Sequence, residues 1–211
     1  MTGFDPEIVS SSIKGVISAY NSLSDALITQ MQTSFVNAMA TKWACKNAQN
    51  FFTTSFKPSV DSLITQSNTL FTSVVSAMNS SAIAWATATE STYSPISFET
   101  NNTLMDIEGI QESINGVRGI DLEGTPEVVN TLKTIAGNAE SALESAVGAV
   151  QSCGFIGGDQ AANLIASLNT IKSNVNSAVS EITSTVKTAI DQTVTAYGNT
   201  KGQIEQAFNG E

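Results

Sequence analysis

The sequence predicts an all-α fold, an elongated four-helix bundle made of two tandem helical hairpins. Apolar residues recur every three or four positions over long stretches, which places them on one face of an α-helix. Hydrophobic residues make up 41% of the chain but aromatic residues only 7%, so a core of closely packed Ala, Val, Ile and Leu is expected. A helix-start motif of polar cap, Pro and Glu occurs twice, at residues 5–7 and 125–127, and indicates an internal duplication.

The first hairpin is expected over residues 5–95. Asp5 should cap its first helix, with Pro6 at the first helical position. A second apolar stripe begins near Lys46, and Pro58 within it predicts a kink or a break, because proline lacks a backbone donor and clashes with the preceding turn. The stripe of the first helix steps by three and four and then by fours: Val9, Ile13, Val16, Tyr20, Leu23, Leu27, Met31, Phe35, Met39 and Trp43.

Residues 96–123 are polar and contain several glycines, so we expect a linker with a short helix around 104–114. The second hairpin is expected over residues 124–209, with Thr125 as the cap of its first helix. Its last helix should run from about Asp159 to Tyr197 and continue weakly beyond. Each hairpin has one apolar face that it cannot bury alone, which favours packing the two hairpins against each other.

Composition argues against several classes of function. The net charge is −10 and the chain contains no His, which disfavours nucleic acids and anionic membrane surfaces as partners. No apolar stretch is long enough to span a membrane, and the N-terminus has neither the basic nor the apolar region of a Sec signal peptide. We expect no metal site, no cofactor and no enzymatic activity, because no cluster of ligands and no nucleophile–base arrangement is found.

Both predicted turns place an aromatic residue beside small residues. The first turn is Trp43-Ala44-Cys45 and the second is Phe155-Ile156-Gly157. The aromatic residue can close the end of the hairpin core, and glycine at the third position allows a positive φ. Cys45 and Cys153 could form a disulfide only if both turns lie at the same end of the bundle; otherwise they are buried thiols.

The two turns resemble the Trp-X-Gly turn of the WXG family, small helical hairpins that are exported by type VII secretion systems and pair as dimers. The chain looks like two such units fused in tandem, with degenerate motifs: Cys45 replaces Gly in the first, and Phe155 replaces Trp in the second. The resemblance implies hairpins packed head to tail, with their turns at far ends. It also identifies Tyr197 as a counterpart of the family's export signal, although Lys201 stands where that signal has an acid.

The resemblance implies a non-enzymatic bacterial protein that is secreted or held at the cell surface. It would bind the secretion machinery or a co-secreted protein through helix faces, as a monomer or homodimer. The two turns and the Tyr197–Lys201 pair are the candidate recognition residues. Two alternatives stay open: a membrane-acting helical toxin component, whose most apolar segment would be residues 70–86, and a coiled-coil filament subunit.

Overall fold

The computed structural model describes residues 4–209, and helices dominate it, which confirms the prediction of an all-α fold. The described chain also has two short strands, β1 Trp43–Ala44 and β2 Gly119–Ile120. Two helical stretches, η1 and η2, are π-helices. The helical elements of the first hairpin are α1 Pro6–Ser24, η1 Asp25–Val36, α2 Asn37–Ala40, α3 Lys46–Phe51, η2 Phe52–Phe56 and α4 Lys57–Ala88, and those of the second are α5 Gly124–Ser152 and α6 Gly158–Asn209.

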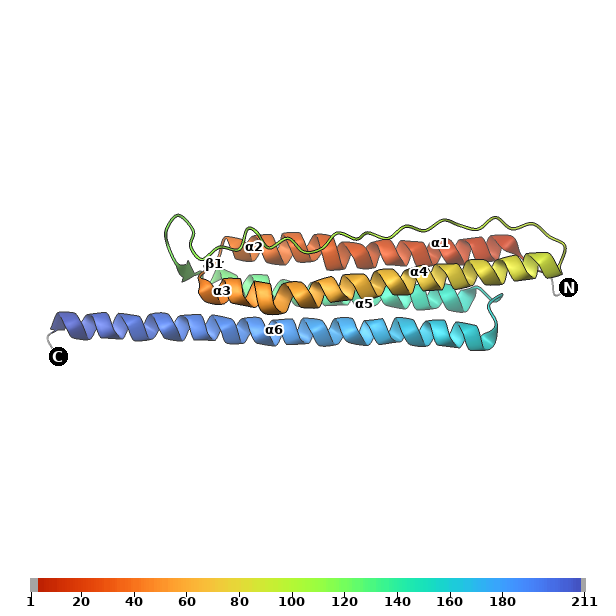
Figure 1. Cartoon of the computed structure of the whole chain (residues 1–211). Helices are drawn as coiled ribbons and strands as arrows, with labels where there is room; N and C mark the ends of the chain where they lie inside the picture. Colours follow the sequence, from red (N-terminus) through yellow and green to blue (C-terminus); the bar gives the residue numbers. More distant parts are fainter. Residues whose placement is uncertain (1–3, 210–211) are drawn as a thin grey trace.

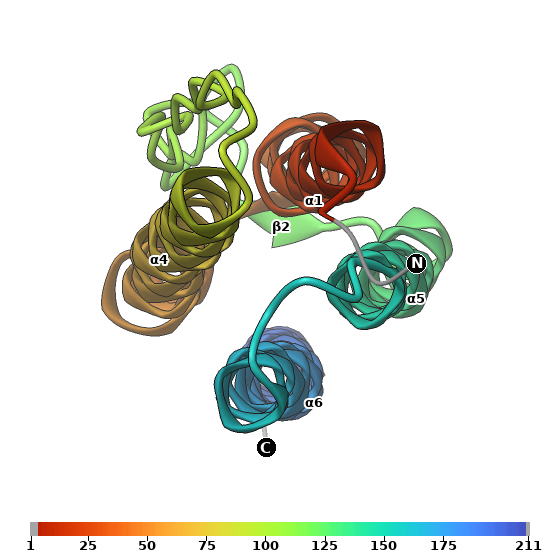
Figure 2. The same ribbon diagram turned by 90° about the vertical axis from the view of Figure 1, so that its right-hand side faces the viewer.

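Four long helical rods lie side by side around one apolar core that runs along the molecule (Figures 1 and 2). Both α4 and α5 pack against α1 and against α6. The two hairpin turns lie at opposite ends of the rods, so the hairpins pack head to tail (Figure 1). Cys45 and Cys153 are accordingly separate, buried free thiols.

The two ends of the molecule differ in composition. We call the end that carries β1, β2 and the C-terminal part of α6 the β-ribbon end. At the opposite end, Phe4, Trp85, Tyr93 and Phe155 form a chain of ring contacts, and we call it the aromatic end. The connection between the hairpins runs from the aromatic end to the β-ribbon end (Figure 1).

The π-helix η1 explains the run of four-residue steps in the first apolar stripe. In an α-helix of 3.6 residues per turn, each step of four overshoots one turn by about 40°. The wider π turn, closed by bonds between residues five apart, absorbs this drift; Asn37 N, for example, donates to Gln32 O. As a result Leu27, Met31 and Phe35 all remain buried.

Pro58 does not interrupt the second rod, in which residues 46–88 are helical without a gap. A proline inside an α-helix would clash with the carbonyl four residues before it. Here the π-helix η2 ends at Phe56, two residues before the proline, and Lys57 N donates to Phe52 O, five residues back. Of the predicted kink or break, the break does not occur, and the hydrogen-bond register changes just before Pro58 instead.

The contact between α1 and α5 is close because small residues face each other across it. A Cβ atom added to Gly15 would lie 3.1 Å from the Cβ of Ala149. Larger side chains at this point would force the two helices apart. Gly15 and Ala149 thus allow the close approach of α1 and α5.

The connection between the hairpins is an extended segment, residues 91–118, which we call the strap. It lies along the first rod and α4 (Figures 1 and 2), and Phe98 packs edge-on against Tyr20 with ring centroids 4.9 Å apart. The short helix expected around 104–114 does not form within this described segment. An extended chain cannot bond its own peptide groups as a helix does, so they need partners elsewhere.

Side-chain amides supply many of those partners. The Asn79 amide accepts a hydrogen bond from Ile96 N at 3.0 Å and donates one to Ile96 O at 2.9 Å. Gln32 does the same for Asp106, accepting from its N at 3.0 Å and donating to its O at 2.8 Å. Each amide thus replaces the hydrogen-bonding edge of a neighbouring strand, which makes the extended conformation of the strap stable without a sheet.

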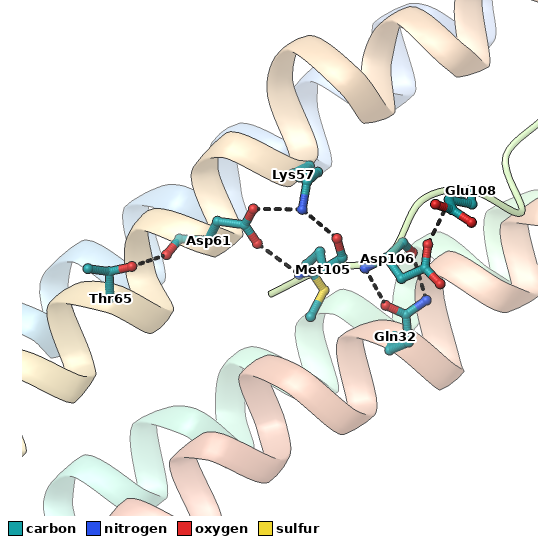
Figure 3. A network of polar contacts seen from close by, with 7 residues as sticks. All are labelled: Gln32, Lys57, Asp61, Thr65, Met105, Asp106 and Glu108. Carbon is teal, nitrogen blue, oxygen red and sulfur yellow. Dashed lines mark hydrogen bonds and ion pairs between the residues drawn. The ribbon is translucent and has the colours of Figure 1, made fainter. Parts of the chain in front are cut away.

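An ion pair holds the middle of the strap (Figure 3). Asp61 Oδ1 accepts from Met105 N at 2.8 Å, and Lys57 Nζ donates to Met105 O at 2.5 Å. Lys57 and Asp61 lie one helical turn apart on α4 and also pair with each other at 2.9 Å. The Met105 side chain is buried, so apolar packing and backbone hydrogen bonds fix the same residue.

The second hairpin begins differently from the first. Asp5 caps α1 as predicted, because its side chain accepts from Glu7 N and Ile8 N. Thr125 does not cap α5: its hydroxyl is buried without a hydrogen-bond partner among the described residues. Asp121 takes that role, accepting from Gly124 N at 2.9 Å and pairing with Lys42 at 3.1 Å. These interactions lower the pKa of the Asp121 carboxyl, and they tie the start of α5 to the first turn.

We expect Gly15→Leu to lower the free energy of unfolding by about 1–3 kcal/mol, because it overpacks the contact between α1 and α5. Gly148→Ala is the matched control: it lies on α5 with open space around the added Cβ, and it should raise stability by about 0.5–1 kcal/mol through helix propensity. Chemical denaturation measures both. A Gly15→Leu protein as stable as the unmodified chain would contradict the close approach.

We expect Asn79→Ala to increase amide hydrogen exchange at Ile96 roughly tenfold to a hundredfold, because an unpaired peptide group costs about 1–3 kcal/mol. Exchange can be followed residue by residue by NMR. Asn163→Ala, at an exposed position of α6, should leave Ile96 unchanged. Equal exchange rates at Ile96 in the two variants would show that the Asn79 amide does not hold the strap.

Candidate functional site

The first predicted recognition motif faces the interior of the protein. Trp43 is fully buried and Ala44 and Cys45 are nearly so. Trp43 packs on Phe51 with ring centroids 6.1 Å apart, and the Cys45 Sγ lies 3.8 Å from the Thr193 hydroxyl of α6. These side chains close the end of the core, as the structural interpretation of the motif predicts, and they offer no exposed surface of their own.

The backbone of the same motif connects the two hairpins. Trp43 pairs with Ile120 and Ala44 with Gly119 in the antiparallel ribbon of β1 and β2. Cys45 has a φ of −170°, an extended conformation that any residue adopts. The presence of Cys where the WXG turn has Gly is therefore compatible with the local backbone.

The second predicted motif lies at the aromatic end. Phe155 is half-buried and meets Phe4 and Trp85 edge-on, with centroid distances of 5.3 and 6.1 Å. Ile156 is about 9% exposed, and Gly157 is exposed. The positive φ expected at Gly157 falls instead on Gly154, at +67°. The reason is that the chain leaves α5 at Gly154, whereas Gly157 already leads into α6 and its carbonyl accepts from Ala161 N at 2.9 Å.

Tyr197 and Lys201 lie on the last part of α6, beyond its buried residues. Thr193 is the last buried residue among the described part of α6. From there the helix continues past the other elements (Figure 1), and we call residues 194–209 the overhang. Over its 16 residues an α-helix extends about 24 Å. Tyr197 is 39% exposed.

A groove brings the overhang together with the strand that pairs with the first turn. It has a volume of about 440 Å³. One wall is β2 and its neighbours, and the other is the start of the overhang. We call it the α6 groove, and its lining consists of Arg118, Gly119, Ile120, Leu122, Val194, Tyr197, Gly198 and Lys201.

The α6 groove combines apolar side chains with two basic ones. Arg118 pairs with Glu112 at 3.4 Å, but both side chains are largely exposed, so this pair contributes little to stability. Partial burial raises the pKa of the Tyr197 phenol, and the nearby Cys45 raises it further while Arg118 lowers it. The phenol therefore stays protonated and can donate a hydrogen bond near neutral pH.

The β-ribbon end is also where the protein exposes most of its large apolar side chains. Ten such side chains are exposed among the described residues. Contiguous exposed apolar surface commonly marks a binding site. Six of the ten are at this end: Ile114, Val117, Leu122, Val194, Tyr197 and Ile204.

A small hairpin beside the groove was not recognised from the sequence. Ile114 and Val117 exchange backbone hydrogen bonds of 2.8 and 2.9 Å. Asn115 and Gly116 between them have φ values of 51° and 80°, as in a type I′ turn, for which Asn-Gly is the strongest sequence signal. The sequence contains this dipeptide at residues 115–116, and the turn that it forms places Arg118 beside the groove.

The described residues contain no group of three or more His, Cys, Asp or Glu side chains placed to hold a metal ion. Burial raises the pKa of the Cys153 thiol, which makes it a poor nucleophile. None of the described helices combines the length and the apolar character that crossing a membrane requires. The arrangement of the α6 groove is suited to docking another molecule.

Comparison of the chain with protein-family models, with curated proteins and with solved structures finds no match.

We expect Gly154→Ala to lower the free energy of unfolding by about 1–2 kcal/mol, because a side chain is strained in the left-handed region. Gly157→Ala should cost less, since no positive φ occurs there.

Cys45→Gly restores the Trp-X-Gly motif in the first turn. It should nevertheless reduce stability by about 1 kcal/mol, because glycine increases the conformational entropy of the unfolded chain and the substitution removes buried apolar surface. Thermal denaturation of the three variants measures these effects, and a stabilising Cys45→Gly would refute this account of the turn.

Proposed function

We propose that the chain is a non-enzymatic tandem helical-hairpin protein of the type VII export class, which acts by helix-mediated binding to the secretion machinery or to a co-secreted protein. One observation carries the proposal: the Trp43 turn of the first hairpin and the Tyr197 segment of the second meet at one end. They are more than 150 residues apart in the chain, and β2 joins them around the α6 groove.

The chemistry of the α6 groove supports binding by a helix. A helical partner buries an apolar stripe in an apolar groove and uses charges at the rim to set its register. Leu122 and Tyr197 provide exposed apolar surface, and Arg118 and Lys201 provide cationic groups. Tyr and Arg are also the residue types that most often dominate interface energies.

Binding fits this groove better than catalysis does. Its polar side chains are Arg118, Lys201 and the Tyr197 phenol. A base or nucleophile needs a pKa near or below neutral pH, but the pKa of Tyr197 is raised. The proposed location is outside the cell or at its surface, reached by type VII export.

Of the two alternatives, the filament subunit gains support from a specific feature, the projecting α6 (Figure 1). The apolar segment of a membrane-acting component would have to come from residues 70–86. In the structure Phe71, Val74 and Met78 of this segment are buried in the common core, so inserting it would disrupt the bundle. We therefore do not propose the membrane-acting role.

We expect export of the full chain to be lost in host cells that lack the membrane ATPase of the type VII system. In cells that have the ATPase, Tyr197→Ala should reduce the secreted amount at least about tenfold, because truncating a Tyr that acts as a hot spot costs about 2 kcal/mol or more and about 1.4 kcal/mol already corresponds to a tenfold loss of binding. Quantitative immunoblots of culture supernatant measure both. Leu104→Ala is the control, since Leu104 is 50% exposed on the strap, away from the groove. Unchanged export without the ATPase would refute the proposal.

A further inference from the structure

The sequence contains two acceptor motifs for N-linked glycosylation, which have the form Asn-X-Ser/Thr with X other than proline. One is Asn79-Ser80-Ser81 on α4, and the other is Asn101-Asn102-Thr103 on the strap. A sugar can be attached only where an enzyme can reach the Asn side chain, so modified motifs lie on surface loops. The two motifs differ in this respect.

The motif on α4 is closed to modification. The Asn79 Oδ1 accepts hydrogen bonds from Ile96 N at 3.0 Å and from the Tyr93 hydroxyl at 2.6 Å, and its Nδ2 donates to Ile96 O at 2.9 Å. Its backbone is part of the regular helix α4. A bulky sugar on Nδ2 would break these hydrogen bonds and separate the strap from α4.

The motif on the strap is open. Both Asn101 and Thr103 are exposed. The helices hold the backbone of this segment, because Asn101 N donates to the Tyr20 hydroxyl at 2.5 Å and Asn101 O accepts from Asn68 Nδ2 at 2.8 Å. Asn102 reaches back to α4, where its Oδ1 accepts from Asn68 Nδ2 at 2.9 Å. Consecutive side chains of an extended chain point to opposite sides, which leaves Asn101 and Thr103 on the solvent side.

The two groups that a glycosyl transferase uses are available in this motif. Neither the Asn101 NH2 group nor the Thr103 hydroxyl forms a hydrogen bond with another residue in the described part of the chain. The Asn101 Oδ1 accepts from Thr103 N at 3.0 Å, an Asx-turn that keeps the amide and the hydroxyl close together. An enzyme can therefore bind the hydroxyl and reach the amide nitrogen without first displacing the strap.

A polar groove beside Asn101 has room for a first sugar. Its volume is about 390 Å³, and Asn101 lines it together with Asn21 and Ser24 of α1 and Asp25 of η1. Amide, hydroxyl and carboxylate groups can form hydrogen bonds with the hydroxyls of a sugar. A sugar on Asn101 would thus have polar partners on the protein and would disturb no contact of the core.

We propose that Asn101 is an acceptor site for N-linked glycosylation. In this reaction the Asn101 amide nitrogen attacks the anomeric carbon of a sugar that carries a diphosphate leaving group. The N–C bond forms as the C–O bond to the diphosphate breaks, one amide proton passes to a base of the transferase, and the diphosphate leaves with its nucleoside or lipid. The inference rests on the proposed location of the chain outside the cell or at its surface, where such motifs are modified.

Mass spectrometry of the full chain, purified from the cells and from the culture supernatant of its native host, tests the proposal. We expect an added mass of whole sugar residues, which fragmentation assigns to Asn101. Asn101→Gln and Thr103→Ala should both abolish it, because an enzyme site built to bind a substrate hydroxyl rejects an analogue without it by about 10⁴-fold or more. Thr103→Ser keeps the hydroxyl and should keep the sugar.

Asn79→Gln is the matched control, since it removes the other motif and should leave the added mass unchanged. Circular dichroism checks that each variant is folded. Because Thr103→Ala and Thr103→Ser both leave Asn101 in place, the difference between them reports on recognition of the hydroxyl and not on the structure of the strap.

A reconstituted reaction identifies the sugar donor and does not depend on the folding of a variant. The folded full chain, produced without modification in another bacterium, is incubated with host membranes, which supply lipid-linked donors, or with host cytosol and nucleotide-linked sugars. We expect Asn101 to be modified in one of the two reactions and Asn79 in neither. The reaction that modifies Asn101 shows whether the diphosphate carries a lipid or a nucleoside.

Two results would overturn the inference. One is a chain that carries no sugar in either fraction from the host. The other is a sugar that remains in Asn101→Gln or lies on Asn79. An unmodified chain whose export depends on the type VII ATPase would overturn this inference alone, whereas a chain modified at Asn101 whose export does not need the ATPase would overturn the proposed function alone.

Discussion

The opposite orientation of the two hairpins is the constraint on which the rest of the structure depends. Because their turns lie at opposite ends, the chain must cross the full length of the rods between α4 and α5 (Figure 1). An exposed peptide crossing of this length would gain little from apolar burial. The helices hold the crossing segment in place with polar side chains. Asn79 and Gln32, for example, each form hydrogen bonds with both the backbone N–H and the backbone C=O of one residue of the strap. The end of the strap thereby places β2 where it pairs with β1 in the first turn, and Asp121 where it caps the start of α5.

Much of the helical framework could be predicted from local pattern. The spacing of apolar residues predicted where the helices lie, and Asp5 caps α1 as predicted. Both predictions were possible because helix periodicity and capping depend on residues that are close in sequence. Neither π-helix was predicted, although the four-residue steps from Leu23 to Trp43 are a sequence signal of η1. The short helix around 104–114 was predicted wrongly because tertiary partners override local propensity. Asp61 and Lys57 bond the peptide groups of Met105, and those partners are more than 40 residues away.

Individual residues of the candidate site could be predicted from the sequence, but which of them lie together could not. Trp43, Phe155 and Tyr197 were selected by their positions in the repeat, but nothing local shows that Trp43 and Tyr197 share an end while Phe155 does not. That separation follows from the packing of the hairpins. The α6 groove also needs the 112–122 segment, whose Asn115-Gly116 turn was a readable signal. Burial of Trp43 assigns it to the core, so any recognition at this end falls to residues that it supports, such as Ile120 and Tyr197.

The way the strap is held has a consequence for how this chain can change over time. Gln32, Asp61 and Lys57 contact peptide groups of the strap, which every amino acid provides. Asn79 does the same at Ile96 and also accepts a hydrogen bond from the Tyr93 hydroxyl. Substitutions at outward-facing strap positions such as Ser97 or Leu104 leave these contacts intact, whereas a proline at 96, 105 or 106 removes a donor that a helix side chain needs. Outward-facing positions of the strap such as Ser97 and Leu104 are thus free to diversify, whereas Tyr93, Phe98 and Met105 are constrained by their own side-chain contacts.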